Sequence, residues 1–145
     1  MNILKSLPGP LLIFFGALSL SFGGLIVPNA EELADIAEES AQFARKFGHD
    51  PRVALLSFSN FGQPLRPHME RIRDAVAILE ERKVDFEFDG DMQADVALDY
   101  DLMKEVFPFC RLTGPANVLV MPALHSASIS SNLMAAVGGG TVIGP

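Results

Sequence analysis

The chain has 145 residues and a mass of 15.7 kDa, which leaves room for one domain. Its apolar content of 49% is typical of a globular protein, and its single cysteine excludes an internal disulfide framework and a cysteine-rich zinc site. Eleven basic residues against 18 acidic ones give a net charge of −7. That sign is wrong for binding a phosphate backbone, so we expect no nucleic-acid partner.

Residues 1–27 form an apolar N-terminal segment that is open to several interpretations. Leu11 to Val27 is a run of 17 residues without a charge, diluted by glycine and serine. It could be a buried, strand-like segment, a membrane anchor or a cleaved signal peptide. Because the rest of the chain has the pattern of a cytosolic domain, we expect a buried segment in a cytoplasmic protein. Membrane anchoring through residues 11–27 is the alternative.

From residue 28 onward, helical and strand patterns alternate. Asn29 is a predicted N-cap for a first helix, which Gly48 ends. A buried strand over 52–58, a loop over 59–64 and a helix over 68–83 follow. The alternating residues 84–88 predict a second strand, closed by a turn at Asp89-Gly90.

The second half of the chain continues this alternation. Its pattern predicts a helix over 94–106, an apolar strand over 117–121, a helix over 126–137 and a further strand that begins at Thr141. Strands that alternate with helices indicate βαβ units. We therefore expect an α/β fold, a three-layer α/β/α arrangement with a mostly parallel sheet covered on both faces. Ligands of such sheets bind beyond the carboxyl ends of the strands.

Three short segments are candidates for ligand contact. The turn Ser57–Gly62 follows a strand and could donate backbone N–H and hydroxyl groups to a phosphate, or be a plain turn. In the loop Leu112–Asn117, Thr113 could bind an anion, or the Gly-Pro pair could simply shape the loop. His125-Ser126 could contact a ligand or cap the helix that follows.

Two other features are interpreted structurally. Cys110 is predicted to be a small core residue rather than a reactive thiol. The acids Asp89, Asp91 and Asp95 do not fit a calcium loop, and we expect them to form a solvated turn and a helix cap. No metal site is predicted.

Several long segments carry a family resemblance. The stretches 53–62 (VALLSFSNFG) and 84–98 (VDFEFDGDMQADVAL) resemble the phosphate acetyl/butyryltransferase family. The run 107–131 (FPFCRLTGPANVLVMPALHSASISS) and the segment 138–145 (GGGTVIGP) resemble one branch in particular. That branch is the C-terminal phosphotransacetylase-like domain of large NADP-dependent malic enzymes. The resemblance covers residues 28–145, which we interpret as a partial domain of this type, a fragment of the family fold.

The resemblance implies a fold of two subdomains with a ligand cleft between them. True transferases of the family move an acetyl group between coenzyme A and phosphate. The malic-enzyme branch implies instead a regulatory domain that binds acetyl-CoA and assists homo-oligomer formation. Acetyl-CoA or coenzyme A and phosphate are thus the expected ligands, with no cofactor in this chain. NADP and a divalent metal would belong to a malic-enzyme domain that the chain does not contain.

The resemblance leaves the catalytic residues unknown, because the family's Ser-Arg pair and Asp lie beyond the matched segments. The expected ligand contacts are polar or glycine residues of the three candidate segments: Ser57, Ser59, Asn60, Thr113, Gly114 and His125. Three functions stay open. These are an acetyl-CoA-sensing domain of a hybrid malic enzyme, part of an active phosphotransacetylase, and a small membrane-anchored or interaction protein.

Overall fold

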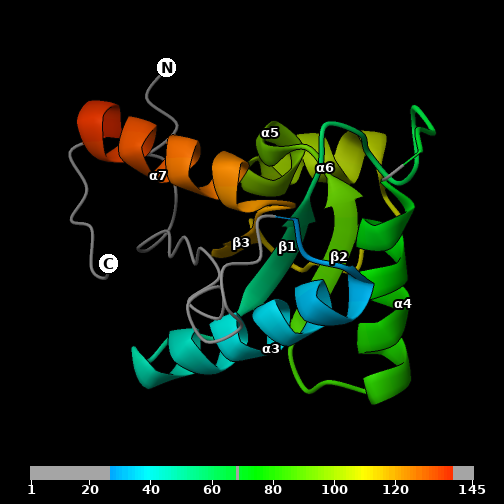
Figure 1. The fold of residues 1–145 in the computed structure, drawn as a ribbon, viewed down its shortest axis with the longest axis horizontal. Coiled ribbons are helices and arrows are strands. Elements are labelled where there is room, and N and C mark those ends of the chain that lie inside the picture. Colours follow the sequence, from blue (N-terminus) through cyan, green and yellow to red (C-terminus); the bar gives the residue numbers. More distant parts are fainter. Residues whose placement is uncertain (1–26, 68, 139–145) are drawn as a thin grey trace.

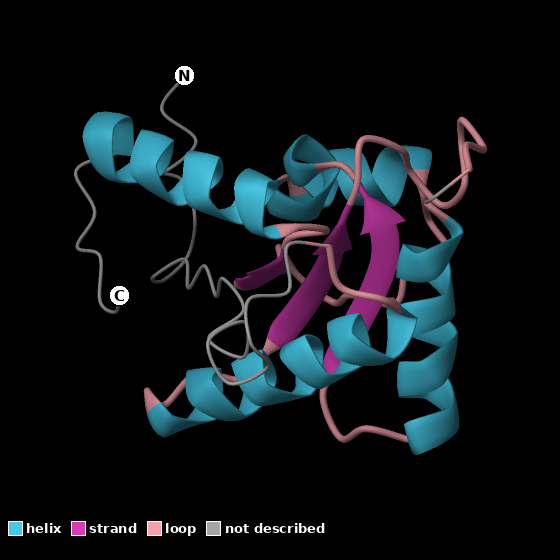
Figure 2. Cartoon of the chain, in the orientation of Figure 1, coloured by secondary structure: helices cyan, strands magenta, loops and turns pink. Residues whose placement is uncertain are grey.

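The computed structural model describes residues 27–67 and 69–138. The N-terminal segment up to residue 26 and the predicted strand from Thr141 lie outside the described residues. The elements are α3 (Ala30–Lys46), β1 (Arg52–Leu56), α4 (Glu70–Arg82), β2 (Glu87–Met92), α5 (Ala94–Leu98), α6 (Tyr100–Val106), β3 (Val118–Val120) and α7 (Leu124–Gly138). The three strands are parallel, in the order β2-β1-β3. The arrows of β1 and β2 point the same way in Figures 1 and 2.

Helices cover both faces of the sheet, which confirms the predicted three-layer α/β/α fold. Successive residues of a strand point to opposite faces. Val53 and Leu55 of β1 therefore pack against α3 and α4, while Ala54 and Leu56 pack against residues of α5, α6 and the loop after α6. In Figure 1 the α3 and α4 side lies below and to the right of the strands, and α5 and α6 lie above.

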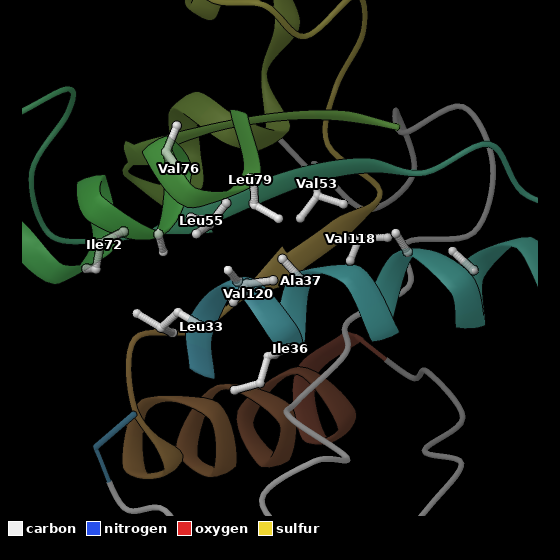
Figure 3. Packing of buried hydrophobic residues seen from close by; sticks show 14 residues of the cluster. Leu33, Ile36, Ala37, Val53, Leu55, Ile72, Val76, Leu79, Val118 and Val120 are labelled. Atoms are coloured by element: carbon white, nitrogen blue, oxygen red, sulfur yellow. The ribbon is translucent and has the colours of Figure 1, made fainter. Parts of the chain in front are cut away.

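The larger core lies between the sheet and the α3–α4 pair (Figure 3). Leu33 and Leu79 are each at most 1% exposed in the folded chain. Burial of a leucine side chain stabilises a fold by about 1.5–3 kcal/mol. The residues labelled in Figure 3 come from two helices and two strands: Leu33, Ile36, Ala37, Val53, Leu55, Ile72, Val76, Leu79, Val118 and Val120.

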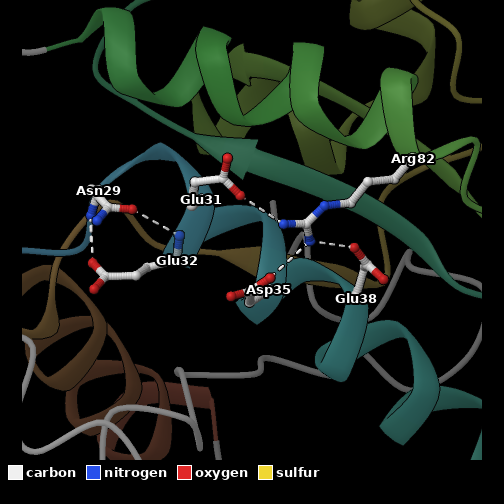
Figure 4. A network of polar contacts seen from close by, with 6 residues as sticks. All are labelled: Asn29, Glu31, Glu32, Asp35, Glu38 and Arg82. Atoms are coloured by element: carbon white, nitrogen blue, oxygen red, sulfur yellow. Dashed lines mark hydrogen bonds and ion pairs between the residues drawn. The ribbon is translucent and has the colours of Figure 1, made fainter.

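The start of α3 is as predicted. Asn29 accepts a hydrogen bond from the Glu32 N–H at 2.9 Å, and the Glu32 carboxylate accepts one from the Asn29 N–H at 2.8 Å. This reciprocal capping box satisfies two of the amide groups that a helix start leaves free. Figure 4 shows the pair.

An ion-pair network joins α4 to α3. The Arg82 guanidinium, at the end of α4, lies 2.9 Å from Glu31, 2.8 Å from Asp35 and 2.6 Å from Glu38 (Figure 4). The three acids lie along one side of α3, so one cation bridges two turns of that helix. These hydrogen bonds raise the pKa of Arg82, which is charged at every accessible pH.

The bounds of β2 show that two sequence predictions are wrong. It runs over residues 87–92 rather than 84–88, and Asp89-Gly90 lies inside it rather than in a turn. Asp89 and Asp91 are buried, not solvated, because each finds hydrogen-bond donors in other segments. Asp95 is exposed, as expected.

Gly90 has a φ of +157°, and an added Cβ would lie 2.7 Å from the Leu55 carbonyl oxygen, so only glycine fits there.

The predicted helix over 94–106 is also corrected, because it is two short helices. Asp99 has extended backbone angles, and its carboxylate accepts a hydrogen bond from the Leu102 N–H at 3.0 Å. Asp99 thus ends α5 and caps α6.

The last helix, α7, begins at Leu124 instead of Ser126, so Ser126 lies within its first turn. Within the part of the chain that the structure describes, no helix has the length and apolarity needed to cross a membrane.

Candidate functional site

The loop Ser57–Gln63 leaves the carboxyl end of β1 and is fastened to the neighbouring strand β2. The Ser59 hydroxyl donates a hydrogen bond to one carboxylate oxygen of Asp91. The Gly62 N–H donates to the other oxygen at 3.0 Å, and the Phe61 N–H donates to the Asp91 carbonyl at 2.6 Å. Asp91 is 0% exposed. A buried carboxylate needs several donors to offset the loss of its hydration, and the loop supplies them.

A second connection fastens the middle of the same loop. The Asn60 Nδ2 donates to Gln93 Oε1 at 3.0 Å, and the Gln93 N–H donates to Asn60 Oδ1 at 2.8 Å. Gln93 also donates from Nε2 to the Phe58 carbonyl at 2.5 Å. The loop is therefore held by two residues of the β2 end, Asp91 and Gln93.

The structure brings Ser57, Ser59 and Asn60 together in this loop. The Ser57 and Ser59 hydroxyl oxygens are 3.0 Å apart, and Ser57 also donates to the Met69 sulfur at 3.3 Å. Ser59 is completely buried, so its hydroxyl holds the loop from inside. Ser57 and Asn60 are half-buried and lie closer to the surface. Whether they contact a ligand stays a prediction.

Thr113 and Gly114 lie at the other end of the strands, away from the Ser57–Gln63 loop. The Thr113 hydroxyl donates to Glu87 Oε1 at 2.7 Å, and its N–H donates to Glu87 Oε2 at 2.9 Å. Glu87 pairs with Arg52 at the start of β1, and the Arg52 side chain lies beside Gly114. The loop before β3 is thus at the amino ends of the strands and does not join the Ser57–Gln63 loop. Sequence order could have shown this, because a loop that precedes a parallel strand lies at its amino end.

His125 is on the same edge as the Ser57–Gln63 loop, in the first turn of α7, and it is exposed. Within the described residues it makes no hydrogen bond or ion pair. The neighbouring Ser126 hydroxyl donates to the Ala123 carbonyl at 2.7 Å. Contact of His125 with a ligand stays a prediction.

An unpaired cation and a cluster of rings lie at the loop, and the ring cluster left no pattern in the sequence that could have indicated it. Arg73 of α4 makes no hydrogen bond or ion pair with any described residue, and a Cβ on Gly62 would lie 2.8 Å from its Nη1. The ring of Phe61 lies 5.2 Å from that of Phe107 and 4.9 Å from that of Phe109. Phe61 has a φ of +50°, which is rare for an aromatic residue.

Cys110 is a core residue, as predicted. It is 4% exposed, and burial raises the pKa of its thiol to about 11, which keeps it protonated at neutral pH. This thiol is therefore unsuited to nucleophilic catalysis. In residues 27–67 and 69–138, no three His, Cys, Asp or Glu side chains meet in a group that could hold a metal ion.

Comparison with known proteins confirms the resemblance seen in the sequence. Residues 23–145 match the model of the phosphate acetyl/butaryl transferase family. An NADP-dependent malic enzyme of Rhizobium meliloti is 59% identical over 119 residues, which are 82% of this chain and 16% of that protein. A phosphate acetyltransferase of Treponema pallidum is 42% identical over 121 residues, which are 81% of this chain and 36% of that protein.

A solved structure supports the same assignment. The EutD phosphotransacetylase of Staphylococcus aureus superposes with a TM-score of 0.74 at 34% sequence identity, covering 81% of this chain and 37% of that one. The chain thus spans well under half the length of the relatives it matches. By sequence and by fold, it belongs to the phosphate acetyl/butaryl transferase family.

Proposed function

We propose that this chain is the phosphotransacetylase-like domain of a hybrid NADP-dependent malic enzyme and binds acetyl-CoA as a regulatory ligand. The observation that carries the proposal is the 59% identity to the Rhizobium meliloti malic enzyme, against 42% to the Treponema pallidum phosphate acetyltransferase. NADP and a divalent metal would then serve a separate malic-enzyme domain. The protein would be cytoplasmic and homo-oligomeric.

The described residues support ligand binding. The Ser57–Gln63 loop lies at the carboxyl edge of the sheet, where ligands of parallel sheets bind. Its backbone is held rigidly by Asp91 and Gln93, which favours a preformed site.

An active phosphate acetyltransferase is the second candidate. The TM-score of 0.74 to the EutD phosphotransacetylase and the identity to the Treponema pallidum enzyme favour it. Such an enzyme would release coenzyme A from acetyl-CoA in the presence of phosphate. Arginine side chains would hold the phosphate and stabilise the developing oxyanion.

One experiment on the full-length protein separates the two candidates. Acetyl-CoA is titrated by calorimetry, and release of the coenzyme A thiol is then followed with and without inorganic phosphate. The regulatory proposal predicts saturable binding without phosphate-dependent release. Phosphate-dependent release would establish the transferase instead, and the absence of binding would contradict both functions.

A further inference from the structure

The edge of the sheet that carries the Ser57–Gln63 loop also carries an exposed aromatic ring. Phe109 is 64% exposed, although it lies only three residues after the end of α6 and beside the core. Its ring lies edge-on to Phe61 at 4.9 Å with an interplanar angle of 73°, and edge-on to Phe107 at 6.1 Å with an angle of 79°. Two half-buried rings thus support a third, which faces solvent.

The supporting rings are fixed from below. Phe61 and Phe107 pack against the core cluster that contains Met92, Met103 and Cys110. The Phe61 N–H is bound to the Asp91 carbonyl, and the Phe107 N–H donates to the Met103 carbonyl at 2.8 Å. Because these contacts hold the two supporting rings in place, those rings would lose little rotamer freedom when a flat molecule covers Phe109.

A cation from α4 lies beside the next residue of the loop. The Arg73 guanidinium lies beside Gly62, the residue after Phe61, and has no counter-ion among the described residues. Guanidinium groups bind phosphate by paired hydrogen bonds. An exposed aromatic ring near an unpaired arginine suits a ligand in which a flat heteroaromatic base is joined to phosphate groups.

From this juxtaposition we propose that Phe109, supported by Phe61 and Phe107, stacks on the adenine ring of acetyl-CoA while Arg73 contacts a phosphate of the same nucleotide. The inference rests on the proposed function and deepens it, since it assigns the nucleotide half of the ligand to the Phe61–Gly62 part of the loop. The exposed ring of Phe109 is the reason for assigning the adenine base to this place. Aromatic stacking is insensitive to which base is bound but requires a flat ring on the protein.

The test uses the full-length protein and two probes, acetyl-CoA and adenosine 3′,5′-bisphosphate. The second probe keeps the adenine, the ribose and two of the three phosphates of coenzyme A and lacks its pantetheine arm. Both are titrated by calorimetry into the wild type, Phe109→Leu, Phe109→Trp and Arg73→Gln. Phe109→Leu should weaken both probes by roughly the same factor of ten, the loss expected for one stacked base. Phe109→Trp, which keeps a flat ring, should bind as the wild type does, and Arg73→Gln should also weaken both probes.

A matched control is Phe47→Ala. Phe47 is 50% exposed and follows α3, at the amino edge of the sheet, so its removal should leave both affinities unchanged. Wild-type affinity for acetyl-CoA in Phe109→Leu, or equal losses in Phe109→Leu and Phe109→Trp, would overturn the inference and leave the proposed function intact. Absence of acetyl-CoA binding by the wild type would instead overturn the proposed function.

Discussion

Asp91 is a carboxylate with no exposed surface, and the shape of the Ser57–Gln63 loop depends on it. Its two oxygens accept hydrogen bonds from the Ser59 hydroxyl and the Gly62 N–H. The sequence predicts a solvated turn at Asp91, because its donors lie about thirty residues earlier in the chain and leave no local pattern. Ser59 and Asn60 are recognisable as polar loop residues, but spacing does not predict their partners at the end of β2.

The substitution Asp91→Asn should destabilise the chain by about 2 kcal/mol, because an amide N–H₂ group would face a donor and leave it buried without an acceptor. Urea denaturation measures the difference. The exposed acid Asp101 has no hydrogen bond from its side chain to a described residue, and Asp101→Asn is the control, expected to change stability by less than about 0.5 kcal/mol. Equal effects of the two substitutions would contradict the anchoring role.

The burial of Cys110 predicts slow alkylation of its thiol. Only the thiolate reacts with iodoacetamide, and burial raises the pKa of this thiol to about 11 from 9.0. At pH 8 the folded chain should therefore react about 100-fold more slowly than an unfolded one, and the rate should rise with pH up to about 11. Mass spectrometry follows the reaction at this single cysteine. Alkylation at the rate of a free thiol, without urea, would show that Cys110 is not buried.

At the scale of helices and strands, apolar periodicity predicted most of the architecture. The spacing of Leu33, Ile36 and Ala37 placed α3, because a helix that covers a sheet must present one apolar face. The boundaries of β2 could not be predicted in the same way. Its last four residues, Asp89–Met92, include two acids that are buried only because Arg111, Ser59 and Gly62 donate hydrogen bonds to them.

The close contact between β1 and β2 predicts a strong effect of Gly90→Ala. A methyl group there would lie 2.7 Å from the Leu55 carbonyl oxygen, in a backbone conformation that alanine avoids. Overpacking and backbone strain together should cost roughly 3 kcal/mol. Gly48 also has a positive φ, of +80°, but an added Cβ meets nothing within 4 Å, so Gly48→Ala should cost about half as much. Similar urea midpoints for the two variants would be inconsistent with this packing.

The Arg82 network predicts a salt-dependent contribution to the α3–α4 contact. Arg82→Ala should lower the free energy of unfolding by about 1 kcal/mol at low salt, because three acids of α3 lose their shared cation. The loss should shrink in 0.5 M salt, which screens exposed charges. Arg66→Ala is the matched control, since Arg66 is exposed and its side chain contacts no described acid. A loss that does not change with salt would assign the effect to packing.

At the scale of the whole molecule, α7 carries a large apolar surface. Ala127 is its only buried residue in the described chain, whereas Ile129, Leu133 and Val137 are 67%, 60% and 75% exposed. These three residues repeat every four positions and so share one side of the helix. Exposed apolar patches of this kind mark interaction surfaces or cause aggregation.

The isolated chain should therefore self-associate in dilute buffer. Sedimentation velocity over a range of concentrations measures this, and Leu133→Glu should shift the population toward monomer without lowering the urea midpoint. His125→Glu, a substitution at an exposed polar position of the same helix, is the control and should leave association unchanged. A monodisperse wild-type monomer at all concentrations would contradict the expectation.

The measurement that tests the central proposal most directly is the rate of NADP-dependent malate oxidation by the full-length protein as acetyl-CoA is added. A regulatory domain must couple its ligand to the activity of another domain, so the account predicts a saturable change in rate. Phe109→Leu should move that change to roughly tenfold higher acetyl-CoA. A malate oxidation rate that is independent of acetyl-CoA, or no such activity at all, would contradict the account.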